Sequence, residues 1–274
     1  MFGDPHNAKE DRQGSGGPAV KIIAVASQKG GTGKTTTAAA IACWAAEHGI
    51  RTLAVDLDPQ GSLTHIFRGD GTAPGAYELL KGDTQASQIV QTGDDLPDLI
   101  SASLQLAGAD TEFSTKPGRD FFLRKALERD NGRWDLVVVD TPPTLGTLLV
   151  NALTAADKVI IPLQADTFAA QAIFQLMETI EQVQQYCNRD LEVAGVLLTR
   201  YSGRTVLSRD LREDLEGKCA ELDLRLFPPI SEGIAVKEAQ TMQQSLFAYA
   251  PKSRPVEDYC IVIKEILGGK IDHA

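Results

Sequence analysis

Short apolar runs alternate with helix-forming stretches along most of the chain. The runs that predict β-strands are Lys21–Ser27, Thr52–Leu57, Asp98–Ala102, Leu136–Asp140, Lys158–Leu163 and Leu191–Leu198. Uninterrupted aliphatic runs such as residues 136–139 suit strands that are covered on both faces. Since helical patterns lie between most of these runs, right-handed crossovers are expected. The pattern therefore predicts an α/β fold with one mainly parallel, twisted sheet and helices on both faces.

No internal repeat or linker divides the 274 residues, so we expect a single domain over residues 20–270. Residues 1–19 are polar and contain glycines without periodicity, which favours a mobile tail. No apolar run approaches the roughly 20 residues that span a bilayer, and the amino terminus lacks a basic-then-apolar signal pattern. A cytoplasmic location is therefore expected. The four cysteines form no C-x-x-C pair, which indicates neither a disulfide framework nor a cysteine metal site.

A glycine-rich loop follows the first predicted strand and precedes a helix-forming stretch. This order presents backbone N–H groups and the positive end of a helix dipole to phosphate. Lys34 is placed to meet the β- and γ-phosphates, and Thr35 can offer its hydroxyl to Mg²⁺. The residues predicted to bind the nucleotide here are Lys29, Gly30, Gly31, Thr32, Gly33, Lys34, Thr35 and Thr36.

The loop departs from the general phosphate-loop pattern G-x-x-x-x-G-K-[ST] at its first position. Gln28 stands where the first glycine should be, and a second lysine, Lys29, follows it. Two lysines in one loop crowd like charges, which is tolerable when a highly charged anion neutralises both. The alternative is that Lys29 is a solvated loop lysine.

Carboxylates at strand ends near such a loop can hold Mg²⁺ and orient water. Asp140 ends a predicted strand and is followed by Thr-Pro-Pro, which predicts a carboxylate that faces the metal through a water. Asp56 and Asp58 are one residue apart, so they share a face if strand geometry continues as far as Pro59. The alternative for either of these two acids is to cap the helix that follows.

These motifs together resemble those of the ParA/MinD ATPases. K-G-G-T-G-K-T-T, V-D-L-D-P-Q-G and D-T-P-P are similar to the deviant Walker A, Walker A′ and Walker B motifs of that family. The ParA branch, which segregates DNA of plasmids and chromosomes, is favoured by the runs at residues 195–200, 203–205 and 249–253. The resemblance implies a P-loop fold of the deviant Walker type and slow, Mg²⁺-dependent hydrolysis of ATP to ADP and phosphate.

The resemblance also implies a homodimer that forms on ATP binding, in which Lys29 reaches the phosphates of the partner. It implies that Asp58 positions the attacking water. The residues that it assigns to catalysis are Lys29, Lys34 and Asp58, and those that it assigns to Mg²⁺ are Thr35, Asp58 and Asp140. The implied adenine contacts are Thr199, Arg200 and the turn from Pro229 to Ser231. A ParB-like centromere-binding protein is the implied partner.

The net charge of −10 argues against a surface coated for nucleic acid, but a local basic stripe is present. If Thr205–Gly217 is helical, then Arg204, Arg209 and Arg212 fall within about 140° of one another. The resemblance places DNA contacts near Arg204 and adds Lys237, so we expect salt-sensitive, nonspecific DNA binding by the dimer and association with the nucleoid. The alternative is an exposed helix with a solvated basic edge.

Two other functions compete with DNA partition. A membrane-associated positioning ATPase similar to MinD would need a terminal amphipathic helix with a basic face. The apolar stretch 259–267 has Glu257, Asp258 and Glu265 in or beside it, so we expect it to pack against the sheet without stable membrane association. A metabolic P-loop ligase is the other candidate, and Lys29 and the D-T-P-P run favour partition over it.

Overall fold

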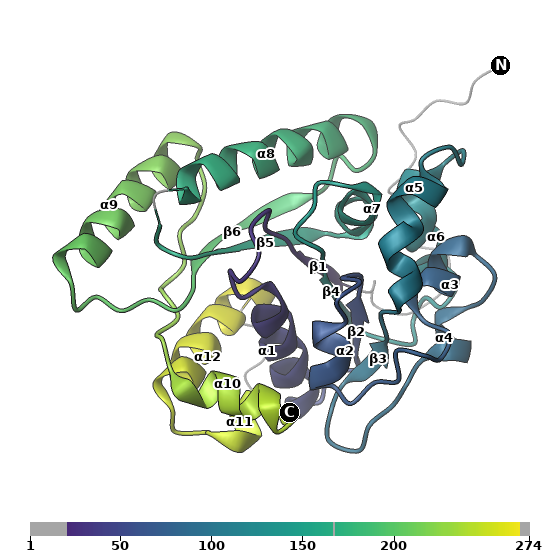
Figure 1. Cartoon of the computed structure of the whole chain (residues 1–274), viewed down its shortest axis with the longest axis horizontal. Coiled ribbons are helices and arrows are strands. Elements are labelled where there is room, and N and C mark those ends of the chain that lie inside the picture. The colour runs from purple at the N-terminus through teal and green to yellow at the C-terminus, as the bar shows by residue number, and fades with distance from the viewer. Residues whose placement is uncertain (1–20, 167, 269–274) are drawn as a thin grey trace.

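The computed structural model describes residues 21–166 and 168–268, and the tail expected at residues 1–19 lies outside this part of the chain. The six strands are β1 (Lys21–Val25), β2 (Thr52–Asp56), β3 (Asp98–Ile100), β4 (Leu136–Asp140), β5 (Lys158–Leu163) and β6 (Glu192–Leu198). They form one sheet in the order β3-β2-β4-β1-β5-β6, and every neighbouring pair is parallel (Figure 1). The predicted sheet is confirmed: β4 and β5 have the predicted bounds, and the other strands differ from them by one or two residues.

Helices cover both faces of this sheet, as predicted (Figure 1). The helices on one face are α3 (Ala76–Lys81), α4 (Ala86–Ile89), α5 (Ala109–Phe113), α6 (Phe122–Glu128), α7 (Thr147–Ala155), α8 (Ala169–Tyr186) and α9 (Val206–Glu221). Short 3₁₀ turns at Leu104–Gly108 and Arg119–Phe121 lie among them. The helices on the other face are α1 (Lys34–Glu47), α2 (Ser62–Ile66), α10 (Ile234–Thr241), α11 (Leu246–Tyr249) and α12 (Arg254–Leu267).

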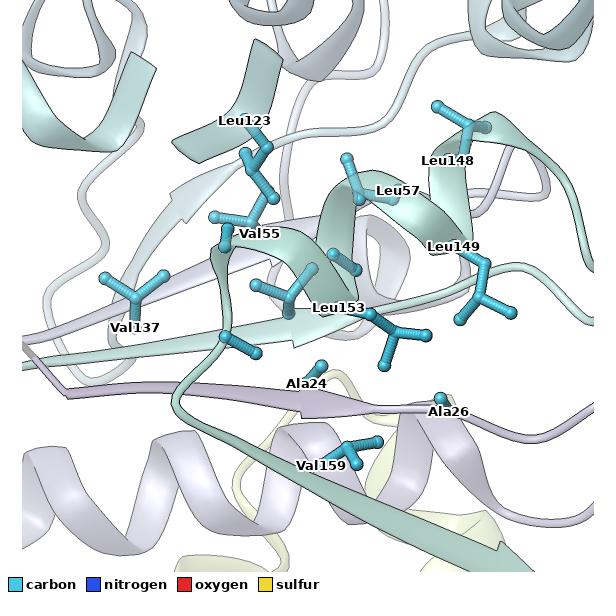
Figure 2. Close-up of a cluster of buried hydrophobic side chains, with 14 of the residues drawn as sticks. Ala24, Ala26, Val55, Leu57, Leu123, Val137, Leu148, Leu149, Leu153 and Val159 are labelled. Carbon is cyan, nitrogen blue, oxygen red and sulfur yellow. The ribbon is translucent and has the colours of Figure 1, made fainter. Parts of the chain in front are cut away.

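Two clusters of buried apolar side chains fill the space between the sheet and its helices, one on each face. Side chains alternate between them along β1, because successive residues of a strand point to opposite faces: Ala24 packs in one cluster and Ile23 in the other. Figure 2 shows the first cluster, in which aliphatic side chains of the strands meet Leu149 and Leu153 of α7. Strands that are buried on both faces need continuous apolar runs, which is why their positions were readable from the sequence.

The last described helix, α12, packs in the second cluster through Val262, Ile263 and Ile266, as expected. The Tyr259 hydroxyl of α12 also lies 3.2 Å from the Thr37 hydroxyl of α1. Among residues 21–166 and 168–268, no helix is both long enough and apolar enough to cross a membrane.

The carboxyl ends of the strands bring the predicted motifs together at one edge of the sheet. Asp56 of β2 and Asp140 of β4 are register partners, and Val25 at the end of β1 is the partner of Asp140 on its other side. The glycine-rich loop connects β1 directly to α1. Ligands of parallel α/β sheets bind outside this edge, where neighbouring connections diverge.

Candidate active site

A cavity of about 670 Å³ opens at the carboxyl edge of the sheet, within the size range of small-molecule sites. The glycine loop and the start of α1 form its floor through Gly30, Gly31, Gly33, Lys34, Thr35 and Thr36. One wall includes Asp58, Gln60, Ser62, Ile66 and Pro143. The remaining lining residues come from the chain after β6, from α10 and from α12: Thr199, Arg200, Ile230, Ser231, Glu232, Gly233, Ile234, Val236, Lys237, Gln240 and Tyr259.

The backbone of the glycine loop is shaped for an anion. Gly31 and Gly33 have φ values of 78° and 85°, a left-handed conformation that glycine adopts without strain. Helix α1 begins directly after Gly33, whose position provides no side-chain cap. The first N–H groups of α1 are therefore available to phosphate oxygens at the positive end of the helix dipole.

Lys34 is held inside this loop. Its side chain is buried, and its ammonium group donates a hydrogen bond to the Lys29 carbonyl at 3.1 Å. Burial lowers the pKa of Lys34, and the nearby carboxyl groups of Asp140 and Asp58 oppose that shift. Keeping this cation buried costs desolvation free energy. Because the N–H groups of the loop lie beside it, its ammonium group is suited to exchange the Lys29 carbonyl for phosphate oxygens.

Lys29, by contrast, does not line the cavity, and its side chain is 45% exposed. Its ammonium group forms an ion pair with Asp166, which lies just after β5. Asp166 also accepts a hydrogen bond from the Phe168 N–H at 2.9 Å. The Gln164 side-chain amide, from the same segment, donates to the Gly31 carbonyl. Asp166 was not predicted, although it is an acid that follows a predicted strand at the same edge as Asp58 and Asp140.

Asp56 and Asp58 do not share a face, because the chain leaves strand geometry after Asp56. The Asp56 carboxylate accepts hydrogen bonds from the Thr64 N–H at 2.8 Å and hydroxyl at 2.7 Å, in the first turn of α2. Burial raises the pKa of Asp56 to about 6. Asp56 therefore caps the following helix, the alternative considered from the sequence. Asp58 is only partly buried and lines the cavity.

Asp140 is fully buried, and neither of its oxygens meets hydrogen-bond geometry with a partner in the described part of the chain. Burial raises its pKa well above the usual value; Asp56 adds to this rise, and the Thr35 hydroxyl and Lys34 oppose it. A buried carboxylate without hydrogen bonds is costly. A divalent cation with its bound waters would remove that cost by neutralising the charge and filling the acceptor positions.

The side chains around Asp140 fit Mg²⁺ in particular. No group of three or more histidine, cysteine or acidic side chains that could hold a metal occurs in residues 21–166 and 168–268. Mg²⁺ needs no such cage, because it keeps several waters and is bound by one or two carboxylates together with substrate phosphates. Asp140, the Thr35 hydroxyl and the cavity-facing Asp58 supply that limited set of oxygens.

Of the predicted adenine contacts, Thr199, Arg200 and the turn residues Ile230 and Ser231 line the cavity, and Pro229 does not. The Thr199 hydroxyl donates to the Thr32 carbonyl at 2.7 Å, so Thr199 holds the glycine loop against the end of β6. Arg200 has a left-handed backbone, with φ of 51°, and its guanidinium lies 3.4 Å from the Glu232 carboxylate. Glu232 was not predicted, since nothing in its local sequence marks it.

The structure brings three of the four predicted DNA contacts together. Arg209 donates to the Gly203 carbonyl at 2.9 Å, and the Arg212 guanidinium lies 5.6 Å from the ring centre of Tyr201. Arg204 is exposed and has no side-chain partner within the described residues. These arginines therefore gather where the chain enters α9. Lys237 is on a different element, α10, where it lines the nucleotide-sized cavity.

Comparison with known proteins identifies the family of this chain. A family of AAA domains matches residues 20–193. The sporulation initiation inhibitor protein Soj of Bacillus subtilis is 37% identical over 251 residues, which cover 90% of this chain and 98% of Soj. The chromosome-partitioning ATPase Soj of Thermus thermophilus is 37% identical over 255 residues, which cover 90% and 96% of the two chains. The chain belongs to the ParA family of ATPases.

A solved structure from Mycobacterium smegmatis extends this comparison to bound nucleotide. The protein, named cobyrinic acid a,c-diamide synthase, holds ADP and magnesium; it is 36% identical to this chain, with a TM-score of 0.78, and covers 92% of this chain and 97% of its own. A second structure of it holds an ATP analogue and magnesium. As a member of the ParA family, our chain is an ATP hydrolase.

Proposed function

We propose that this ParA-family ATPase partitions DNA as a nucleotide-dependent switch. Two subunits form a homodimer around ATP and Mg²⁺, the dimer binds DNA without sequence preference, and a ParB-like protein stimulates hydrolysis and release. Relatives named as chromosome-partitioning proteins support this proposal, since they match about 90% of the chain. The function places the ATP-bound protein on the nucleoid.

The position of Lys29 carries the proposal. A phosphate-loop lysine that served only its own subunit would point into the cavity, as Lys34 does. Lys29 instead extends outside it with nearly half of its side chain exposed. An exposed ammonium group at the mouth of an anion site is available to phosphates in a facing subunit.

In the proposed mechanism, a small number of residues bind Mg²⁺, bind phosphate and orient water. Mg²⁺, when bound, neutralises phosphate charge and orients the γ-phosphate for in-line attack. Asp140 and Thr35 would hold the ion, and Lys34 would bind the β- and γ-phosphate oxygens. Asp58 lies in the wall of the cavity, where its carboxylate accepts a hydrogen bond from the attacking water and orients it.

Lys29→Ala and Asp166→Ala should change ATP-dependent dimerisation in opposite directions. Lys29→Ala removes the group that reaches the partner, so the protein should stay monomeric with a nonhydrolysable ATP analogue. Asp166→Ala removes the carboxylate that holds Lys29 within its own subunit, so dimerisation should strengthen by about 3- to 10-fold. Sedimentation velocity across a concentration series measures both effects.

Lys252→Ala is the matched control, because Lys252 is an exposed lysine remote in sequence from the loop, and its dimerisation should equal that of the wild type. Wild-type protein that stays monomeric with the analogue would overturn the dimer switch. If Lys29→Ala dimerised normally, Lys29 would be a solvated loop lysine.

Arg204→Glu should weaken DNA binding in the ATP state and leave dimerisation unchanged. Each dimer carries the patch twice, so the variant should lose about two phosphate contacts, about 10-fold or more in affinity, and flatten the salt dependence by about two. Retention on random-sequence DNA is compared with ATP, with ADP and without nucleotide.

Arg189→Glu makes the same charge change in the exposed connection before β6, at the opposite edge of the sheet, and should bind DNA normally. Equal losses in both variants would indicate a general charge effect and remove the patch at Arg204. ATPase stimulation by anionic vesicles would favour a membrane role. Turnover that responds to neither DNA with a ParB-like protein nor vesicles would favour small-molecule chemistry.

A further inference from the structure

We infer that Asp258 of α12 is a positioning residue for the nucleoside half of the cavity, acting through the backbone of Ser231. The Asp258 side chain is buried, and its Oδ2 accepts a hydrogen bond from the Ser231 N–H at 2.8 Å. Its Oδ1 lies 3.1 Å from the Arg254 Nε. Ser231 lines the cavity, so a residue of the last helix fixes part of the nucleotide wall.

The wall segment 230–233 is held from two sides. On one side it continues the sheet: the Ile230 N–H donates to the Leu198 carbonyl at 2.8 Å, and the Tyr201 N–H donates to the Ile230 carbonyl at 2.9 Å. On the other side it rests on the start of α12, where a Cβ added at Gly233 would lie 2.7 Å from Pro255 Cγ. At this tightly packed second contact, the Asp258 carboxylate accepts the hydrogen bond from the Ser231 N–H.

The segment faces the nucleoside and not the phosphates. A nucleotide whose phosphates bind the glycine loop has its ribose and base beside the remaining walls. The wall that contains Asp58 is acidic and adjoins Asp140, which suits a metal ion and water. The segment 230–233 and the start of α10 contribute the apolar side chains Ile230, Ile234 and Val236 beside the charged Glu232 and Lys237. A purine ring prefers such apolar surface with a few polar groups.

Loss of the Asp258 carboxylate should therefore weaken contacts with the base and ribose while phosphate binding persists. Calorimetry with Mg²⁺-ADP and with Mg²⁺-tripolyphosphate, well below the melting temperature, measures nucleoside binding and phosphate binding separately. Asp258→Ala should raise the dissociation constant of ADP about 5- to 30-fold and that of tripolyphosphate by less than about 2-fold. In steady-state assays KM for ATP should rise while kcat is kept.

Three further variants test the same contact. Asp258→Asn keeps an acceptor oxygen for the Ser231 N–H and should restore most of the ADP affinity. Gly233→Ala, which would bring a Cβ against the rigid Pro255 ring, should weaken ADP binding selectively without touching Asp258. Glu257→Ala removes an exposed carboxylate from the same helix that also pairs with Arg254, and it should behave as the wild type.

The inference rests on nucleotide binding in this cavity, and the phosphate-only ligand distinguishes the two failures. Wild-type protein that bound neither ligand would overturn the cavity assignment itself. Unchanged ADP affinity in Asp258→Ala would overturn the positioning role alone. Equal losses for ADP and tripolyphosphate would also overturn it, because they would indicate that Asp258 only stabilises the fold.

Discussion

Lys34→Ala should abolish nucleotide binding, with the dissociation constants of ATP and ADP rising about 100-fold or more. The Lys34 side chain is buried and lines the cavity, and its ammonium group donates to the Lys29 carbonyl at 3.1 Å. Charge-assisted hydrogen bonds to two phosphates in a site with little water are among the strongest that a side chain forms. Isothermal calorimetry with ADP and Mg²⁺ measures the loss.

The stability of the nucleotide-free variant separates this explanation from misfolding. Burial disfavours the charged form of Lys34, as its lowered pKa indicates, so its removal should not reduce the melting temperature without nucleotide. Only the rise in melting temperature that ADP causes should disappear. Lys21→Ala is the control, because Lys21 is a half-buried lysine on the same strand-loop-helix unit at the opposite end of β1. ADP affinity that survived in Lys34→Ala would contradict the phosphate role.

The fold was predictable from the sequence because the interiors of its central strands are continuously apolar. β4, with the sequence Leu-Val-Val-Val-Asp, is buried at all five residues, and its bounds were predicted correctly. The ends of β1 and β3 were predicted two residues too far, since small alanine and serine residues continue the buried segment into the loops at the carboxyl edge. Hydrophobic patterning reports burial, and these loop residues are buried without being in strands.

The site was readable only where function fixes residue type within one short segment. The glycine loop and Asp140 belong to such segments. Asp166, Glu232 and Asp258 do not: each meets its partner through a connection of at least 27 residues, and its role depends on which elements the fold places side by side. Asp56 shows the opposite problem, in which a motif residue has a structural role. Although it belongs to a nucleotide-binding motif, its carboxylate accepts a hydrogen bond from Thr64 of α2.

Asp58→Ala should produce a protein that binds ATP and dimerises but does not turn over, with kcat lower by about 100-fold or more. Asp58 lines the cavity, where its Oδ1 accepts a hydrogen bond from the Gln60 N–H at 3.0 Å. Its carboxylate retains acceptor capacity to orient water near the γ-phosphate. Without that orientation the ATP-bound dimer should persist. Sedimentation after incubation with ATP, beside a phosphate-release assay, measures both effects in one sample.

The same variant tells apart the two roles that Asp58 has been given. If Asp58 chiefly binds Mg²⁺, then Asp58→Ala should weaken ATP binding and raise the Mg²⁺ concentration needed for it. If Asp58 chiefly positions water, affinity and Mg²⁺ dependence should match the wild type while phosphate release stops. Gln60→Ala alters the same wall without removing a charge and should hydrolyse ATP normally. Asp140 favours the second outcome, because it already provides Mg²⁺ with a buried carboxylate whose oxygens meet hydrogen-bond geometry with no group in the described structure.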